Sequence, residues 1–246
     1  MSRASLPHVR ALLAPMTPGA RRCAMGNVEE LIDSVLAAGA SSLVAAGDWL
    51  TGTQRKAAAL EARDARTNDL DQQRRRAISP NAVSGGHGSI GDLRAEAVEV
   101  VHRIASDPGR ITRDWADQAI EVLGEETYTE LVGIAACTAR IDMFAWATTD
   151  RDADLEDAVA GEPTNERPDG VGDVGAWVSQ SMGSGMANVS RSLSLVPVTN
   201  SAWVGLVQAM YSRGPEFLDL EWKRALSRPQ VELVAARTTA ELECFY

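Results

Sequence analysis

Apolar residues recur along much of this chain at intervals of three and four, which places them on one face of an α-helix. The spacing predicts helices over residues 28–50, 92–106 and 125–147. The apolar positions behind the first two predictions are Leu31, Val35, Leu43, Leu50, Leu93, Ala97, Val101 and Ile104. The expected buried stripe of the third helix comprises Tyr128, Leu131, Ala135, Thr138, Ile141 and Phe144 or Ala145. Val and Ile do not alternate with polar residues, so the pattern favours helices packed on helices over sheets.

Helix-start signals extend this assignment. Thr51-Gly-Thr-Gln54 reads as a capping box, in which a threonine and a glutamine side chain satisfy free backbone N–H groups reciprocally, and it predicts a helix over 52–76. Ser227-Arg-Pro-Gln230 reads as a second box that opens the last helix, with proline in the first turn where it is tolerated. Other expected features are a cap at Thr112, a helix end at Gly124, a Gly-rich loop over 79–91, a loop over 179–188, and short helices over 203–211 and 216–225.

The expected domain organisation is two helical halves, over residues 28–148 and 174–246, joined by a polar linker over 149–173. Residues 1–27, with three prolines and four arginines, are interpreted as a flexible N-terminal extension. The two capping boxes suggest a weak internal repeat, in which Lys56 aligns with Glu232 and Asn68 aligns with Cys244. A degenerate first copy of one helical unit would explain the pattern, and chance similarity is the competing explanation.

The charge balance limits the classes of partner. The formal net charge is −10, which disfavours general binding to phosphate backbones, so no nucleic acid partner is expected. The run Arg74-Arg75-Arg76 is interpreted as a solvated helix face paired with Asp69 and Asp71. No apolar stretch reaches the roughly 18–20 residues of a membrane span, and no secretory signal is visible, so no membrane is expected.

The cysteines and histidines do not have the spacing of a disulfide framework or of a metal site. Cys23, Cys137 and Cys244 are few and widely spaced, which does not indicate a disulfide framework and suits a reducing, cytoplasmic compartment. Cys137 is expected to be a small core residue of its helix. His87 and His102 show no metal-ligand spacing, so no metal or cofactor is expected. His102 is interpreted as a partly buried structural residue, and His87 receives no role.

The last segment carries the most specific chemistry. It runs from Leu226-Ser-Arg-Pro-Gln-Val-Glu232 to Glu243-Cys244-Phe-Tyr246, with Glu232 twelve residues before Cys244. It resembles the redox segment of the alkylhydroperoxidase (AhpD)-like, carboxymuconolactone-decarboxylase-like family. Two further segments, 107–115 and 123–132, look like the helical core of that family, and 161–168 and 192–197 resemble its longer peroxidase-related branch. The resemblance covers roughly residues 28–246.

The resemblance implies an all-α, AhpD-like helical bundle and a thiol-dependent peroxidase that reduces hydrogen peroxide or organic hydroperoxides. It makes Cys244 and Glu232 the catalytic candidates, with Cys244 as the resolving cysteine. Position 247 would hold the attacking cysteine and a histidine would follow, so the chain is expected to stop partway through the motif. The implied partners are a small-molecule peroxide, an unidentified thiol reductant and further copies of the chain in a homo-oligomer.

Two other classes of function stay open. A carboxymuconolactone-decarboxylase-type enzyme would bind a small carboxylate substrate without a cysteine pair, although Cys244 after Glu232 argues against it. A binding or assembly protein would keep the fold and lack the chemistry. Fold alone does not separate these readings.

Overall fold

The computed structural model describes residues 18–149, 151–183, 187–211, 216, 219 and 226–241, with side chains in the first helix described from Glu30 onward. Within these residues the chain forms nine α-helices and one two-stranded antiparallel sheet, which confirms the predicted all-α bundle. The helices are α2 (Pro18–Val44), α3 (Gly52–Asp64), α4 (Asp69–Arg76), α5 (Ala95–Ser106), α6 (Arg113–Leu123), α7 (Glu125–Thr149), α8 (Asn188–Arg191), α9 (Pro197–Met210) and α10 (Arg228–Glu241). The strands are β1 (Val171–Gly172) and β2 (Gln180–Ser181), and two 3-10 turns cover Pro80–Ala82 and Pro108–Arg110.

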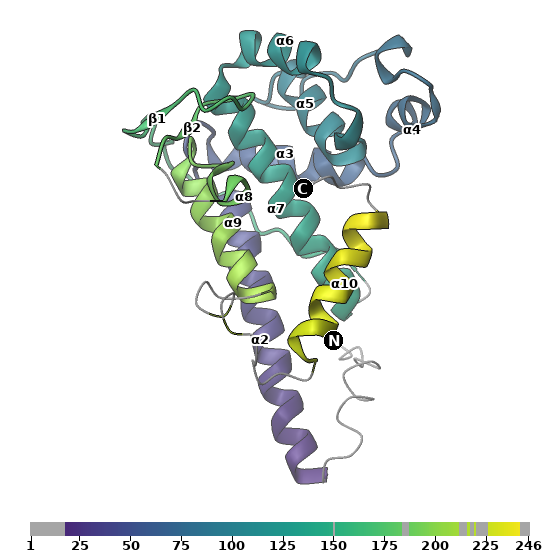
Figure 1. Cartoon of the computed structure of the whole chain (residues 1–246), viewed down its shortest axis with the longest axis vertical. Coiled ribbons are helices and arrows are strands. Elements are labelled where there is room, and N and C mark those ends of the chain that lie inside the picture. The colour runs from purple at the N-terminus through teal and green to yellow at the C-terminus, as the bar shows by residue number, and fades with distance from the viewer. Residues whose placement is uncertain are drawn as a thin grey trace. The chain divides into compact units, whose positions relative to one another are not determined.

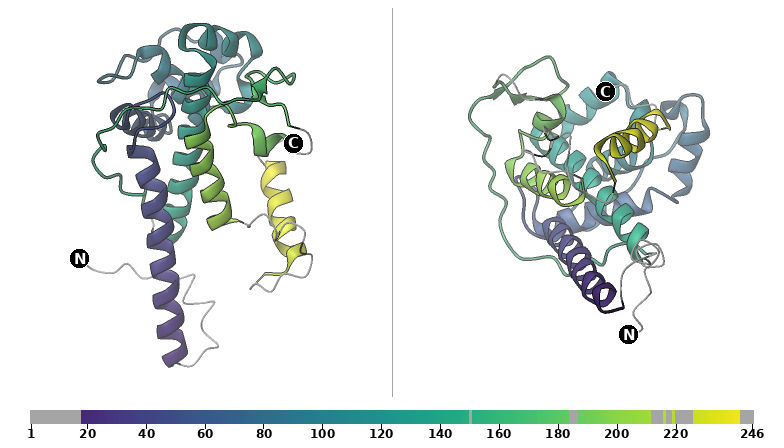
Figure 2. Two further views of the ribbon diagram at one scale, coloured as in Figure 1. Left: turned by 90° about the vertical axis from the view of Figure 1, so that its left-hand side faces the viewer. Right: turned by 60° about the horizontal axis from the view of Figure 1, so that its bottom comes forward.

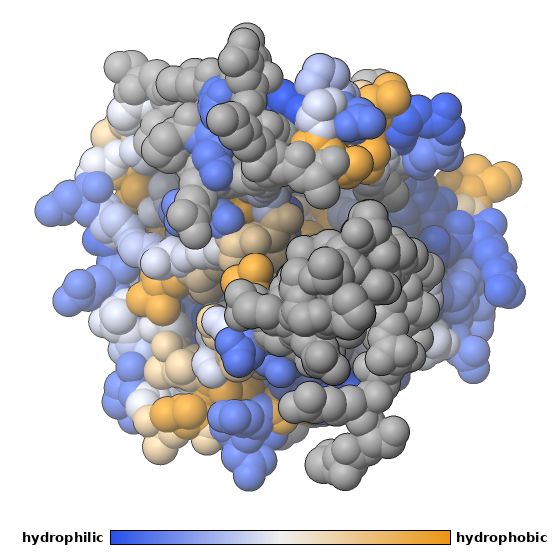
Figure 3. All heavy atoms as spheres, turned by 90° about the horizontal axis from the view of Figure 1, so that it is seen from below, coloured by the Kyte–Doolittle hydropathy of each residue, from blue (hydrophilic) through white to orange (hydrophobic). Residues whose placement is uncertain are grey.

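The chain divides into two compact units, Met1–Leu206 and Val207–Tyr246. In the first unit α7 is the central helix, and α2, α3, α5 and α6 pack against it (Figure 1). Figures 1 and 2 both show the beginning of α9 running alongside α2. The core between these helices contains Leu43, Leu131, Ile134, Ile141 and Leu195, each at most 1% exposed. Seen from below, hydrophobic residues lie in small groups between hydrophilic ones (Figure 3).

Several predicted elements are confirmed close to their expected bounds. The buried face of α7 includes Tyr128, Leu131, Ala135, Thr138, Ile141 and Ala145. Thr112 caps α6 by accepting a hydrogen bond from the N–H of Trp115, and Gly124 ends it with a φ of 81°. The Thr51 capping box is complete. At the second box, the Gln230 side chain accepts a hydrogen bond from the Ser227 N–H over 2.8 Å.

Two predicted helices have the wrong bounds. The helix expected over 28–50 ends at Val44 rather than at residue 50. The same helix begins at Pro18 rather than near residue 28, because the first helical turn needs no bonded N–H and therefore tolerates proline. Residues 1–17 of the predicted extension lie outside the described residues. The single helix expected over 52–76 is two helices, because Asn68 starts a new one: its side chain accepts a hydrogen bond from the Leu70 N–H over 3.1 Å.

The polar connection over 149–173 lies on the first unit rather than between the compact units. Val159 donates a backbone hydrogen bond to the carbonyl of Val44 over 2.8 Å, and Asn165 donates one to that of Asp48, also over 2.8 Å. The compact units divide further along, between Leu206 and Val207. The relation between two helical halves in the sequence stays a prediction.

Among the described residues, α7 is the one helix long and apolar enough to cross a membrane by length and composition, and half of that stretch is buried inside the protein. A buried core helix passes the same test, so the property is weak evidence of a span.

Candidate functional site

The first unit brings two histidines and three carboxylates together between α3, α4 and α5. Asn68 starts α4 at a point that puts Asp71 in its first turn, completely buried. On the strongly amphipathic α5, His102 lies on the inward face and is completely buried as well. The loop before α5 carries His87, whose side chain is 8% exposed. We call Glu61, Asp71, His87, Glu99 and His102 the histidine–carboxylate cluster.

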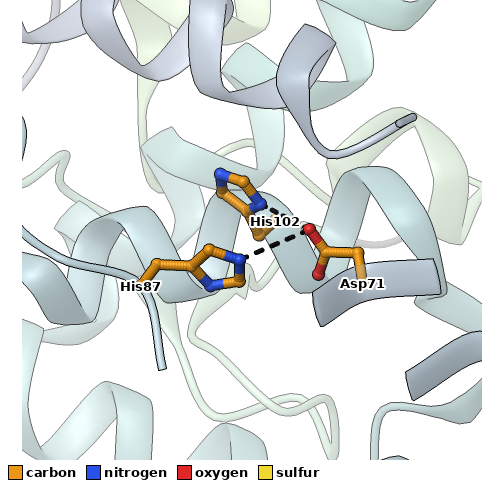
Figure 4. A group of neighbouring side chains, drawn as sticks. All are labelled: Asp71, His87 and His102. Atoms are coloured by element: carbon orange, nitrogen blue, oxygen red, sulfur yellow. Dashed lines mark hydrogen bonds and ion pairs between the residues drawn. The ribbon is translucent and has the colours of Figure 1, made fainter. Parts of the chain in front are cut away.

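Hydrogen bonds and one longer ion-pair contact connect the members of this cluster. Both imidazole rings turn a nitrogen toward one oxygen of Asp71: Nδ1 of His102 lies 2.6 Å from it and Nε2 of His87 lies 3.4 Å from it (Figure 4). The rings are stacked, with their centroids 3.7 Å apart.

The far side of each ring meets a second carboxylate. Nε2 of His102 lies 2.9 Å from Glu61, and Nδ1 of His87 lies 2.7 Å from Glu99. Glu99 in turn pairs with the Arg74 guanidinium at 2.7 Å.

The cluster shifts the pKa of its members. Burial alone would lower the pKa of His87, but the interactions with Asp71 and Glu99 outweigh burial and raise that pKa to about 9. Burial alone would raise the pKa of Asp71, but the two histidines hold it well below its ordinary value. For Glu99 too, His87 and Arg74 outweigh burial and lower the pKa. The cluster can hold and pass protons, and its two nitrogens and one oxygen are also a ligand set for a metal ion.

Surface hollows adjoin the cluster. One, of about 360 Å³, is lined by His87, Glu99 and Trp115, among others. A neighbouring polar hollow of about 590 Å³ shares Glu99 and Trp115 and adds Arg103. Arg103 is 1% exposed and stacks over the Trp115 ring at 5.4 Å. Its Nε and Nη2 atoms are buried without a hydrogen-bond partner, which leaves charged donors beside the hollow.

A second buried polar network joins α3, α7 and α9 of the first unit. Glu130 pairs with Arg55 and accepts hydrogen bonds from the backbone N–H groups of residues 48–50. Asp48 accepts hydrogen bonds from the N–H and the hydroxyl of Thr199, each over 3.0 Å, at the start of α9. Both carboxylates are partnered and at most 1% exposed, so this network holds the helices together, and Asp48 also lines a hollow of about 420 Å³.

Of the two catalytic residues predicted from the sequence, the structure describes Glu232 but not Cys244. Glu232 lies early in α10, where its side chain is 45% exposed and accepts hydrogen bonds from the Tyr211 hydroxyl, over 3.4 Å, and from Arg228. Cys244 lies outside the described residues. Cys137 is a buried core residue, as predicted, and burial raises the pKa of its thiol to about 11.

The histidine–carboxylate cluster was missed by the sequence reasoning. The interpretation of Arg74 as part of a solvated face paired with Asp69 and Asp71 is wrong. Arg74 is 6% exposed and pairs with Glu99, while Asp71 turns inward to the histidines. One signal was available, because His102 stands one residue after Val101 on the apolar face of its predicted helix, where a buried histidine needs polar partners.

Comparison of the chain with protein-family models, with curated proteins and with solved structures finds no match to any of them.

Proposed function

We propose that the protein is a thiol-dependent peroxidase, or part of one, that reduces hydrogen peroxide or organic hydroperoxides with electrons from a thiol reductant. The observation that carries the proposal is the pairing of Glu232 with Cys244 twelve residues later, at the spacing of the alkylhydroperoxidase-like motif. The helix between them begins after Ser227, whose N–H donates to the Gln230 side chain, and Glu232 accepts hydrogen bonds from Tyr211 and Arg228.

In this chemistry a thiolate sulfur attacks one peroxide oxygen, the S–O bond forms and the O–O bond breaks. The leaving hydroxide or alkoxide takes a proton, and the sulfur becomes a sulfenic acid. A second thiol then displaces water and forms a disulfide, which an external dithiol reduces by exchange. The resemblance gives Cys244 the resolving role and places the attacking thiol at position 247, beyond this sequence. Glu232 would relay the proton.

Cys137 does not compete for either role. Its thiol is 1% exposed and burial raises its pKa to about 11, so it is almost entirely protonated at neutral pH, whereas attack on peroxide requires the thiolate. Cys137 therefore offers a matched control within the same chain.

The test is peroxide consumption, with dithiothreitol as reductant, by protein expressed from the native gene. Turnover is expected in the wild type, loss of it in Cys244→Ser, and a rate lower by about a hundredfold or more in Glu232→Gln. Cys137→Ala is expected to keep the wild-type rate. Turnover that survives in Cys244→Ser, or none in the folded wild type, would exclude the proposal.

A non-redox enzyme acting on a small carboxylate is the second candidate, and two Arg103 nitrogen atoms without hydrogen-bond partners favour it. Guanidinium donors buried without partners beside a polar hollow suit an anionic ligand, although Glu99 and Asp114 line the same hollow. Calorimetric titration with succinate would then show binding that is weakened in Arg103→Gln and unchanged in Arg113→Gln, an exposed arginine of α6. Equal heats for the two variants would count against this candidate.

A further inference from the structure

We propose that Asp71, His87 and His102 bind a divalent transition-metal ion, with Zn²⁺ as the best match. Nε2 or Nδ1 of each histidine and an oxygen of Asp71 all lie within 4.8 Å of one another. Ligand atoms about 2.0–2.2 Å from a tetrahedral Zn²⁺ lie roughly 3.3 Å apart, so small side-chain movements would close this set around an ion. The proposal is independent of the thiol chemistry of Glu232 and Cys244.

Unpartnered polar atoms point to a missing ligand. Oδ1 of Asp71 is buried without a hydrogen-bond partner, and Nε2 of His87 is buried with only the 3.4 Å ion-pair contact to Oδ2 of Asp71, which is not a hydrogen bond. Their side chains are 0% and 8% exposed, respectively, so solvent reaches little of either. Buried polar atoms are nearly always satisfied in folded proteins, and one ion between the two side chains would satisfy both.

The outer partners of the two rings are those of metal-binding histidines. In metal sites the ring nitrogen opposite the metal usually bonds to a carboxylate, which fixes the tautomer and the ring orientation. Here Glu61 meets His102 at 2.9 Å and Glu99 meets His87 at 2.7 Å, each on the nitrogen that faces away from Asp71. Arg74 then holds Glu99 in place at 2.7 Å.

The net charge of the cluster also suits a divalent cation. With neutral imidazoles, Glu61, Asp71 and Glu99 contribute three negative charges and Arg74 one positive charge, which leaves −2. A divalent ion brings the sum to zero. The alternative is a cluster without metal in which each imidazole carries one additional proton. The two alternatives differ in whether added metal binds.

The ligand types narrow the choice of ion. Two imidazoles with one carboxylate suit Zn²⁺ and its neighbours in the first transition row, whereas Mg²⁺ and Ca²⁺ prefer oxygen ligands. His87 lines the surface hollow of about 360 Å³, which gives an ion a route to the cluster. Three protein ligands would leave a coordination position for water or a substrate, as in catalytic rather than structural zinc sites.

The experiment titrates the chelator-treated full chain with Zn²⁺ alone by calorimetry, and with Co²⁺ by visible absorption, which reports the coordination geometry. The wild type is expected to bind one ion per chain and to give no comparable heat with Mg²⁺. Asp71→Asn and His87→Gln are expected to lose binding, and Glu99→Gln to weaken it by about 10–100-fold. Asp69→Asn, an exposed carboxylate on the same helix, is the matched control and should bind as the wild type does.

Each remaining outcome overturns the proposal. No stoichiometric Zn²⁺ binding by the folded wild type leaves the cluster a proton-filled network. Binding that persists in folded Glu99→Gln and His87→Gln but is lost in Asp64→Asn places the ion at the alternative group of Glu61, Asp64 and His102. Binding lost in Cys244→Ser instead places it at the thiol. Circular dichroism of each variant separates loss of the site from loss of the fold, and Glu99→Gln keeps the test decisive if Asp71→Asn does not fold.

Discussion

At Gly47 a buried ion pair leaves no room for a side chain. Gly47 lies beside Arg55 and Glu130, and a Cβ atom built there would stand 2.1 Å from the Glu130 carboxylate and 2.2 Å from the Arg55 guanidinium. Neither group can retreat easily, because both are at most 2% exposed and are fixed by further hydrogen bonds.

Gly47→Ala is therefore expected to destabilise the first unit by about 3 kcal/mol, the order of the cost of separating a buried ion pair. Urea denaturation followed by circular dichroism would measure the change in the free energy of unfolding. Gly86→Ala is the control, since a Cβ at Gly86 would meet nothing within 4 Å. Similar midpoints for the two variants would mean that the ion pair tolerates a methyl group.

Single residues also mark the limit of sequence reasoning. The burial of Cys137 followed from its place inside an apolar helix, which is a local pattern. The meeting of Asp71 and His102, which are 31 residues apart, depends on how α4 folds back on α5. Arg74 was misread for the same reason: beside two other arginines it looks solvated, and only the packing of α5 supplies Glu99 as its partner.

At the scale of elements, the turn between α3 and α4 has the largest consequence for the site. The capping box at Thr51 predicted one helix through residue 76, but Asn68 offers its side chain to the Leu70 N–H and begins a second helix. Periodicity cannot reveal such a break, because a short polar side chain competes locally with the helical hydrogen bonds. The period of α5 and α7 was read correctly, because no comparable cap interrupts those helices.

Replacing Asn68 by alanine tests the role of that turn. Loss of the cap is expected to cost about 1 kcal/mol of stability and, because Asp71 lies one turn beyond it, to weaken Zn²⁺ binding as well. Thr112→Ala removes the corresponding cap of α6, where Thr112 accepts a hydrogen bond from the Trp115 N–H over 3.3 Å. It should cost a similar amount in urea denaturation while leaving Zn²⁺ affinity unchanged. An Asn68→Ala protein with wild-type affinity would show that packing alone positions Asp71.

For the molecule as a whole, the two buried polar networks differ in how fully their polar groups are hydrogen-bonded. The Arg55–Glu130 network joins α3, α7 and the start of α9, and its carboxylate oxygens accept hydrogen bonds on every side. The histidine–carboxylate cluster is less completely buried, with Glu61 and Glu99 17% and 23% exposed, and one of its carboxylate oxygens, Oδ1 of Asp71, is buried without a partner. Strain and unsatisfied groups gather where a protein binds something, so the histidine–carboxylate cluster is the better place to look for function.

Self-association is the last property expected of the whole molecule. Leu226, Leu233 and Val234 are 49%, 64% and 59% exposed. Leu233 and Val234 are neighbours in α10, and Leu226 lies just before that helix begins at Arg228. Exposed apolar side chains close together in the chain favour contact with another apolar surface, and the resemblance implies a homo-oligomer.

Replacing Leu233 and Val234 together by lysine should lower the association constant or yield monomers, because burying two new charges at the contact is costly. Sedimentation velocity over a range of concentrations would measure the change. Thr239→Lys adds a charge at another exposed position of α10 and should leave association unchanged. A wild type that stays monomeric throughout, or equal effects from both substitutions, would show that these residues of α10 do not mediate association of the chain.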